Sequence, residues 1–273
     1  MLLKNNTLAM ETHSKLYYLC ADDFGWSSGV NDAIVLLSER RVIDGTSIMV
    51  FGSWSAEQIQ GLKDSNIDLG MHLDFTSGLN DKVDNNLHIL LVESYLRVLN
   101  KGDIRELILL QFEEFERRVG RPPSFVDGHQ HIHQFPVIRE ELLKILEELE
   151  LIDKIWIRNT VTNDFGNIKA NLLNFLGGSH SKKMFENRGC TTNRNFLGVY
   201  NFSHNDNYRK YFNKWLLKAA VKKEFTLIMC HPGLADRKNT NDTILESRLY
   251  EFEYLSSDQH HTDVLRFLEV VDE

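Results

Sequence analysis

The stretch LYYLCADDFG, residues 16–25, decides the architecture of this chain. Its apolar and aromatic start predicts a buried strand, and two acids, Asp22 and Asp23, follow directly before a Phe-Gly turn. The stretch FTLIMCHPG, residues 225–233, has the same build, with His231 in the place of the acids. Apolar runs that end in polar groups and alternate with helical segments are typical of parallel β/α folds.

Five further apolar runs predict strands: 47–51, 67–73, 124–129, 155–158 and 196–200. Between the runs, apolar residues recur at spacings of three and four, which predicts helices. These helices are expected at 30–42, 55–63, 103–120, 139–150, 207–223 and 246–257. We therefore expect an α/β fold, a single-domain distorted (β/α) barrel of about seven parallel strands.

Composition limits the partners of the chain. Its 273 residues contain no linker or repeat, so we expect one domain over 1–273, with residues 1–14 as a flexible tail. A net charge of -8 argues against binding to nucleic acid or to an anionic membrane. The three cysteines predict neither a disulfide framework nor a thiolate zinc site. No signal-like segment is evident, so we expect a cytoplasmic protein, and a homo-oligomer is left open.

Polar groups recur where the predicted strands end. In a parallel barrel the carboxyl ends of the strands meet at one face, where barrel active sites lie. The simplest alternative for Asp22 and Asp23 is a turn, with Ser28 or Asn31 capping the next helix. Two adjacent buried carboxylates repel, however, unless a cation or separate roles compensate. The groups expected to converge are Asp22, Asp23, His72, the segment 127–133, Arg158 and His231.

The run DGHQHIH, residues 127–133, carries three of the eleven histidines. In an extended segment Asp127, His129, His131 and His133 would share one side. A single histidine is usually structural, whereas this group indicates a metal or proton-transfer site. Imidazole and carboxylate ligands suit zinc, manganese, iron or magnesium. The remaining histidines are interpreted as surface residues: His13, His88, His180, His204, His260 and His261.

Six motifs follow one another along the chain: ADDFG with GVN, then TSIMV, GMHLDF, VDGHQHIH, MCHPG and Arg-Leu-Tyr-Glu at 248–251. Taken together, these motifs resemble those of the YdjC-like carbohydrate deacetylases. The resemblance implies the barrel of the wider polysaccharide deacetylase group and one divalent ion, Mg²⁺ or Zn²⁺. It assigns Asp23, His72 and His129 as metal ligands, Asp22 as general base and His231 as general acid. One departure is that Cys20 and Ala21 stand where that group has threonine and phenylalanine.

The implied activity is metal-dependent removal of the acetyl group from N-acetylated sugars, with a short N-acetylglucosamine oligosaccharide as the expected substrate. His231 would act as an imidazolium, with a pKa of about 6.5. The remaining candidates would support a ligand or contact substrate: Asp127, His131, His133, Arg158, Phe24 and Trp26, and, as sugar-binding residues, Phe75, Phe135, Asn159 and Asp74. The alternatives are a barrel phosphoesterase or amidohydrolase, and a catalytically inactive sugar-binding relative.

Overall fold

A computed structural model describes residues 17–162, 168–202, 207–222, 225–236 and 242–272. The expected flexible tail at 1–14 lies outside these ranges, as do His13 and His204.

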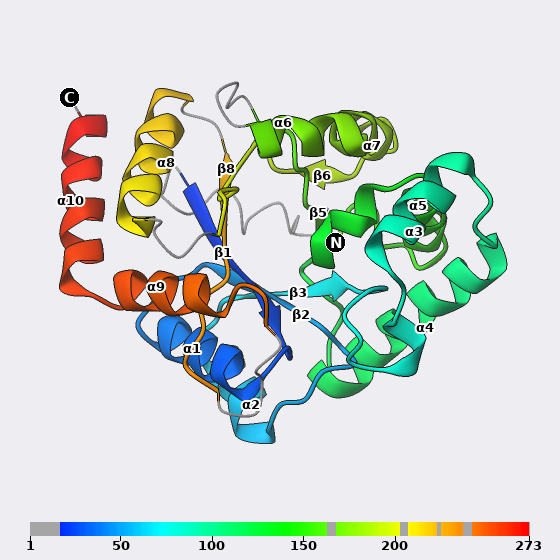
Figure 1. Ribbon diagram of the computed structural model, residues 1–273, viewed down its shortest axis with the longest axis horizontal. Helices are drawn as coiled ribbons and strands as arrows, with labels where there is room; N and C mark the ends of the chain where they lie inside the picture. Colours follow the sequence, from blue (N-terminus) through cyan, green and yellow to red (C-terminus); the bar gives the residue numbers. More distant parts are fainter. Residues whose placement is uncertain (1–16, 163–167, 203–206, 223–224, 237–241, 273) are drawn as a thin grey trace, which may run out of the picture.

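An eight-stranded, fully parallel sheet forms the centre of the described chain (Figure 1). The strand order is β6-β5-β4-β3-β2-β1-β8-β7, so the earliest strands occupy the middle of the sheet. The bounds are β1 Tyr17–Phe24, β2 Gly45–Ile48, β3 Asp68–Leu73, β4 Phe125–Gly128, β5 Trp156–Ile157, β6 Thr191–Thr192, β7 Asn195–Leu197 and β8 Thr226–Cys230.

The expected α/β fold is confirmed, and all seven predicted strands are present. The sheet has one strand more than expected, because Thr191–Thr192 pairs with β5. A strand of two residues is too short to show alternation in a sequence. The strand β1 is also longer than the apolar run, since it continues through Asp22 and Asp23 to Phe24.

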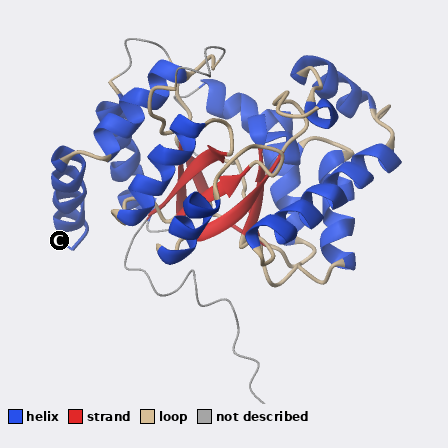
Figure 2. Cartoon of the chain, turned by 90° about the horizontal axis from the view of Figure 1, so that it is seen from below, coloured by secondary structure: helices blue, strands red, loops and turns tan. Residues whose placement is uncertain are grey.

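Helices surround the sheet (Figure 2), with α8 and α10 on the side of β8 and α3, α4 and α5 on the side of β3 (Figure 1). The helices are α1 Ser28–Glu39, α2 Ala56–Asp64, α3 Leu87–Leu96, α4 Lys101–Val119, α5 Ile138–Glu148, α6 Ile168–Leu173, α7 Ser179–Glu186, α8 Tyr208–Lys222, α9 Leu245–Leu255 and α10 Asp258–Asp272. Short turns of helix are η2 Asp81–Val83, η3 His129–Gln134 and η4 Asn174–Gly178. The sequence did not predict α3, α6, α7 or α10.

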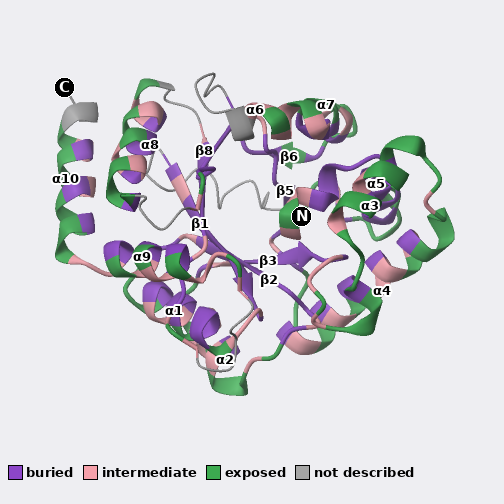
Figure 3. Ribbon diagram, viewed as in Figure 1, coloured by how far each residue is buried: buried purple, intermediate pink, exposed green. Residues whose placement is uncertain are grey.

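The strands are buried almost throughout, which explains their continuous apolar sequences (Figure 3). The three cysteines are free and buried. His88, His180 and His261 are exposed, as predicted. His260 is not: it is buried on α10, where its ring meets the edges of Phe212 and Tyr254. Among the described residues, no helix is both long and apolar enough to cross a bilayer.

The start of α1 is packed against the segment that follows β8. Ser27 caps the helix by accepting a hydrogen bond from the Val30 amide, so neither Ser28 nor Asn31 is the cap. The Leu234 amide donates to the Gly29 carbonyl at 2.9 Å. A Cβ atom at Gly29 would lie 2.2 Å from the Leu234 carbonyl oxygen, so only glycine permits this approach. The contact holds the segments that carry Asp23 and His231 next to each other.

Candidate active site

The side chains of the adjacent acids join one cluster of polar groups because the end of β1 is irregular. The pairing of β1 with β2 shifts register between Ala21 and Phe24, and Asp23 has a left-handed φ of 71°. In a regular strand, neighbouring side chains point to opposite faces. A non-glycine residue at this φ is strained and persists where its surroundings hold it. Asn31 provides such support, because its side chain accepts from the Gly25 amide and donates to the Ser53 carbonyl.

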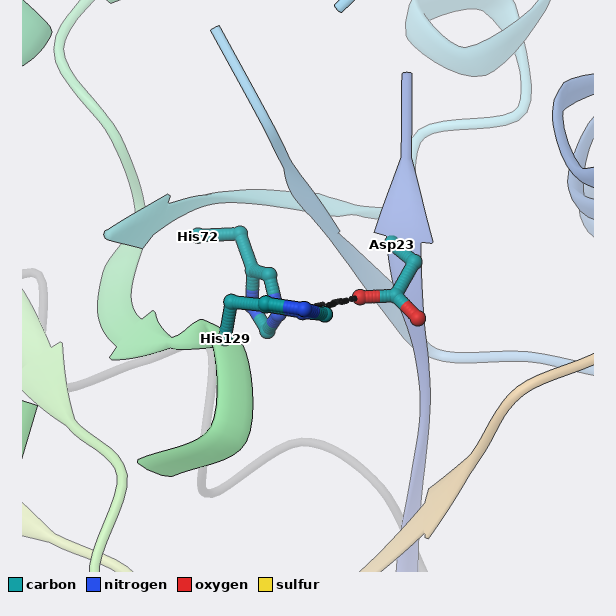
Figure 4. A group of neighbouring side chains, drawn as sticks. All are labelled: Asp23, His72 and His129. Carbon is teal, nitrogen blue, oxygen red and sulfur yellow. Dashed lines mark hydrogen bonds and ion pairs between the residues drawn. The ribbon is translucent and has the colours of Figure 1, made fainter. Parts of the chain in front are cut away.

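Asp23, His72 and His129 point toward one another from three segments (Figure 4). The Oδ1 atom of Asp23 lies 3.1 Å from Nδ1 of His129 and 3.2 Å from Nε2 of His72. His72 comes from β3 and His129 from the start of η3, directly after β4. The first two side chains are buried, whereas 13% of the His129 side chain is exposed. The group therefore lies at the carboxyl ends of β1, β3 and β4, with the His129 side chain partly facing solvent.

The donor atoms of this group fit a divalent cation. One carboxylate oxygen and two imidazole nitrogens lie within 4.8 Å of one another, a set that suits zinc, manganese or iron. Burial disfavours the imidazolium of His72, but the carboxylates of Asp127, Asp23 and Asp22 outweigh it and raise the pKa of His72 to about 10. The surroundings thus favour positive charge at this point, which a bound ion would supply in place of a proton.

Asp127 contacts Nδ1 of His72, whereas Nε2 is the ring nitrogen next to Asp23. Nδ1 of His72 donates to Oδ1 of Asp127 at 2.7 Å and also lies 2.9 Å from the Ser47 hydroxyl. A carboxylate that fixes the second nitrogen of an imidazole ligand sets its tautomer and its orientation. The other Asp127 oxygen lies 2.6 Å from Nη2 of Arg158.

Arg158 binds Asp22 through two hydrogen bonds. Its Nη1 and Nη2 atoms donate to the two carboxylate oxygens at 2.5 and 2.6 Å, and both side chains are buried. Burial favours the neutral acid, but the guanidinium outweighs it and lowers the pKa of Asp22. Cys20, Asp22 and Asp127 also form a second group of possible metal ligands. Arg158 already supplies the cation of that group.

His231 lies beside Asp22 at the end of β8. Its Nε2 atom is 3.9 Å from Oδ2 of Asp22, and 13% of its side chain is exposed. Its backbone amide donates to the buried carboxylate of Glu251 at 2.5 Å. Burial lowers the pKa of His231 to about 4. The expected value near 6.5 is therefore wrong for this environment, and the ring is neutral at pH 7.

The sequence model of the family described as "YdjC-like protein" matches residues 17–266. The chain belongs to the YdjC-like family. The matched residues include Asp23, His72 and His129. They also include Asp22 and Asp127, the two acids that contact Arg158.

Two comparisons relate this YdjC-like protein to individual proteins. A carbohydrate deacetylase of Xenopus laevis is 25% identical over 178 residues, which cover 56% of this chain and 58% of the relative. The alignment thus spans less than two thirds of the relative. A solved Enterococcus faecalis structure, named as a candidate cellobiose-phosphate cleavage protein, matches with a TM-score of 0.67. It is 18% identical, with 92% of this chain and 94% of that chain covered. This likeness shows the fold.

The alternating interpretation of DGHQHIH is wrong in this YdjC-like protein. The strand ends at Gly128, and Gln130 and His131 have left-handed φ values of 52° and 60°. His131 makes a T-shaped ring contact with Phe196. His133 donates through Nε2 to the Arg158 carbonyl at 3.0 Å. Burial lowers the pKa of both, to about 4 for His133, and neither joins the candidate metal group of the described residues.

Several residues expected to contact sugar are used inside the protein instead. Phe24 is fully buried against Trp54, and Phe75 and Phe135 are also buried, so none offers a ring face to a ligand. Trp26 is partly exposed and stacks on His129 at 5.5 Å, which leaves it as an aromatic candidate. Hydrogen bonds within the chain occupy the buried side chains of Asn159 and Asp74.

Two site residues were missed by the sequence reasoning, and both lie on α9. Nη2 of Arg248 donates to Oδ2 of Asp23 at 2.7 Å, and Nε donates to Asp242 at the same distance. Glu251 accepts hydrogen bonds from the Tyr200 hydroxyl and the His231 amide. Both belong to the Arg-Leu-Tyr-Glu motif at 248–251, which was noticed but assigned no role. Its spacing of three places both side chains on one face of a helix.

Proposed function

We propose that this YdjC-like protein is a metal-dependent carbohydrate N-deacetylase. The observation that carries the proposal is the group of Asp23, His72 and His129 beside the arginine-bound Asp22. In this arrangement Asp23, His72 and His129 hold one divalent ion. Such an ion polarises an amide carbonyl and makes water more acidic, which is the chemistry that hydrolysis of an acetamide needs.

Asp22 is the general base of this proposal. Arg158 keeps its carboxylate ionised and fixes both oxygens, so the group is oriented to accept a proton from a water molecule. Its neighbour Asp23 holds the ion, so the adjacent acids have separate roles. Family membership and the relative named carbohydrate deacetylase support the proposed activity.

His231 is the general acid, but it starts the cycle neutral. With a pKa of about 4 it is not an imidazolium at pH 7, so it lacks the acidic proton that a general acid donates. The Asp22 carboxylate, 3.9 Å from Nε2, is the neighbouring group from which a proton can reach it. His231 then protonates the leaving amine. The proton taken up by Asp22 is thereby returned within the same reaction.

The substrate we propose is a short N-acetylglucosamine oligosaccharide. Such a sugar is uncharged, which agrees with a chain of net charge -8. Trp26, partly exposed over His129, offers a ring for a sugar face or an acetyl methyl group.

The test is acetate release from di-N-acetylchitobiose, with monomeric N-acetylglucosamine and chitin polymer in parallel. We expect the disaccharide to react fastest and a chelator to abolish the reaction. Phosphate release from sugar phosphates is measured in the same samples. Release of phosphate without acetate, or acetate release that resists the chelator, would contradict the proposal.

A further inference from the structure

Arg248 occupies one half of the carboxylate that we propose as a metal ligand. Its Nη2 atom donates to Oδ2 of Asp23, whereas Oδ1 of the same carboxylate faces His72 and His129. The arginine comes from α9, which lies 225 residues away in sequence. Both side chains are buried. The two oxygens of Asp23 are therefore unequal before any ion binds.

We propose that Arg248 is a positioning residue that limits Asp23 to one coordinating oxygen, and so biases the site toward ions of low coordination number. The inference rests on the metal site of the proposed function. Neither the family match nor the named relatives assign such a role to this arginine.

The physical reason is competition for the second oxygen. A free carboxylate can bind a cation through both oxygens, which favours ions that accept six or more ligands. Zinc is commonly four-coordinate, and one oxygen with two imidazoles leaves its fourth position open. Because Oδ2 is hydrogen-bonded to a guanidinium, two-oxygen binding would place the ion next to that positive charge and would weaken the charge-assisted bond.

The arginine is also held in place from its other side. Its Nε atom donates to Asp242 at 2.7 Å, and its carbonyl accepts from the Gly233 amide at 3.0 Å. Its guanidinium carbon lies 5.9 Å from the Trp26 ring centre. Arg248 cannot swing away from Asp23 without leaving Asp242 as an unpaired buried carboxylate, which is costly. The restriction on Asp23 is thus built into the packing of α9.

The test compares Zn²⁺ and Mn²⁺ binding to the full chain, stripped of metal and titrated by calorimetry. The main variant is the double substitution Arg248→Met with Asp242→Asn, which removes the arginine without leaving Asp242 charged. The matched control is Asp242→Asn alone, which keeps the bond between Arg248 and Asp23. We expect the preference for Zn²⁺ over Mn²⁺ to fall by about 10-fold or more in the double variant and to stay unchanged in the control.

Arg248→Lys provides a second variant if the double variant does not fold. Lysine keeps the positive charge but lacks the planar fork that contacts both carboxylates. We expect a smaller shift in the same direction. An unchanged preference in each Arg248 variant that folds would overturn the inference while leaving the metal site intact. A wild-type chain that binds neither ion would instead overturn the proposed function.

Discussion

Two buried arginines hold the two adjacent acids of β1, and they do so differently. Arg158 donates to both oxygens of Asp22, whereas Arg248 donates to only one oxygen of Asp23. Each arginine also binds a second acid, Asp127 in one case and Asp242 in the other. The site therefore has two halves, each with one arginine and two acids in a different geometry. The Arg158 half contains Asp22 and Asp127, and the Arg248 half contains Asp23 and Asp242.

This difference explains how neighbouring, chemically identical side chains can have separate roles. Asp22 has no oxygen left that is free of the guanidinium, so it is oriented and kept ionised. Asp23 keeps Oδ1 available, and both imidazoles point at it. The second acid bound by Arg158, Asp127, in turn contacts His72, so the Arg158 half also supports a proposed ligand of the other half.

The largest effect is expected from breaking the Arg158 half with Arg158→Met. This variant leaves Asp22 and Asp127 buried without their cation, which should lower the free energy of unfolding by about 3–5 kcal/mol. Urea denaturation at pH 7 measures this change. The matched control is Arg97→Met, because Arg97 makes a similar two-bond pair with Glu140 on the surface. That pair should contribute less than about 1 kcal/mol. Equal losses in the two variants would contradict the central role of Arg158.

The next comparison separates the two acids directly. Asp22→Asn should retain the ion and lower the rate of acetate release by about 10²–10⁴, the range for lost general base catalysis. Asp23→Asn should lose both the ion and the activity, since it removes a charged ligand. Metal analysis of the purified variants distinguishes these results. Near-normal turnover in Asp22→Asn, or full metal content in Asp23→Asn, would show that the roles are assigned wrongly.

The sequence predicted the fold because parallel strands leave a strong local signal. Buried strands such as Thr226–Cys230 are apolar throughout, and polar residues directly after them mark the strand ends. This logic correctly brought Asp23, His72 and His129 together. It could not find β6, whose pairing depends on its neighbour β5, not on its own two residues.

The errors within the site have a common cause, which is backbone conformation that no side-chain pattern reveals. The alternation of DGHQHIH assumed an extended chain, but Gln130 and His131 adopt left-handed conformations. The pKa of His231 was expected to be ordinary because its burial could not be seen. Arg248 was missed because its partner Asp23 is 225 residues away, and a helical arginine is usually a surface residue.

A third prediction concerns Glu251, a carboxylate on α9 whose direct donors are neutral: the Tyr200 hydroxyl and the His231 amide. Burial raises its pKa from 4.5 to about 7, although these bonds and the charge of Arg248 oppose the rise and Asp22 adds to it. Between these values the folded state holds a proton that the unfolded chain has lost. The contribution of Glu251 to the free energy of unfolding is therefore fully present below about pH 4.5 and is lost as the pH rises through about 7.

Glu251→Gln removes this titration. The free energy of unfolding of the variant, measured relative to wild type, should improve by up to about 3 kcal/mol between pH 4.5 and 8. Denaturation curves at several pH values provide the measurement. Glu253→Gln, on the exposed side of the same helix, is the control and should change little with pH. A constant difference between Glu251→Gln and wild type across this range would show that Glu251 does not titrate there.

The smallest effect is expected from Gly233→Ala, which moves Arg248 without changing any charge. An added Cβ atom would lie 3.0 Å from Cβ of Arg248 and 3.2 Å from its Cδ, so the stem of the arginine must shift by a few tenths of an ångström. We expect the free energy of unfolding to fall by about 1 kcal/mol, typical of mild overpacking. The preference for Zn²⁺ over Mn²⁺ should shift in the direction of the Arg248 variants.

Gly61→Ala is the control, because Gly61 lies in the helix α2, far from the site, and its nearest neighbour is the side chain of Val35 at 3.3 Å. It should be neutral or slightly stabilising. If Gly233→Ala lowers stability but leaves the metal preference unchanged, the contact between Asp23 and Arg248 tolerates displacement, and the restriction on Asp23 depends on the charge of Arg248 more than on its exact position.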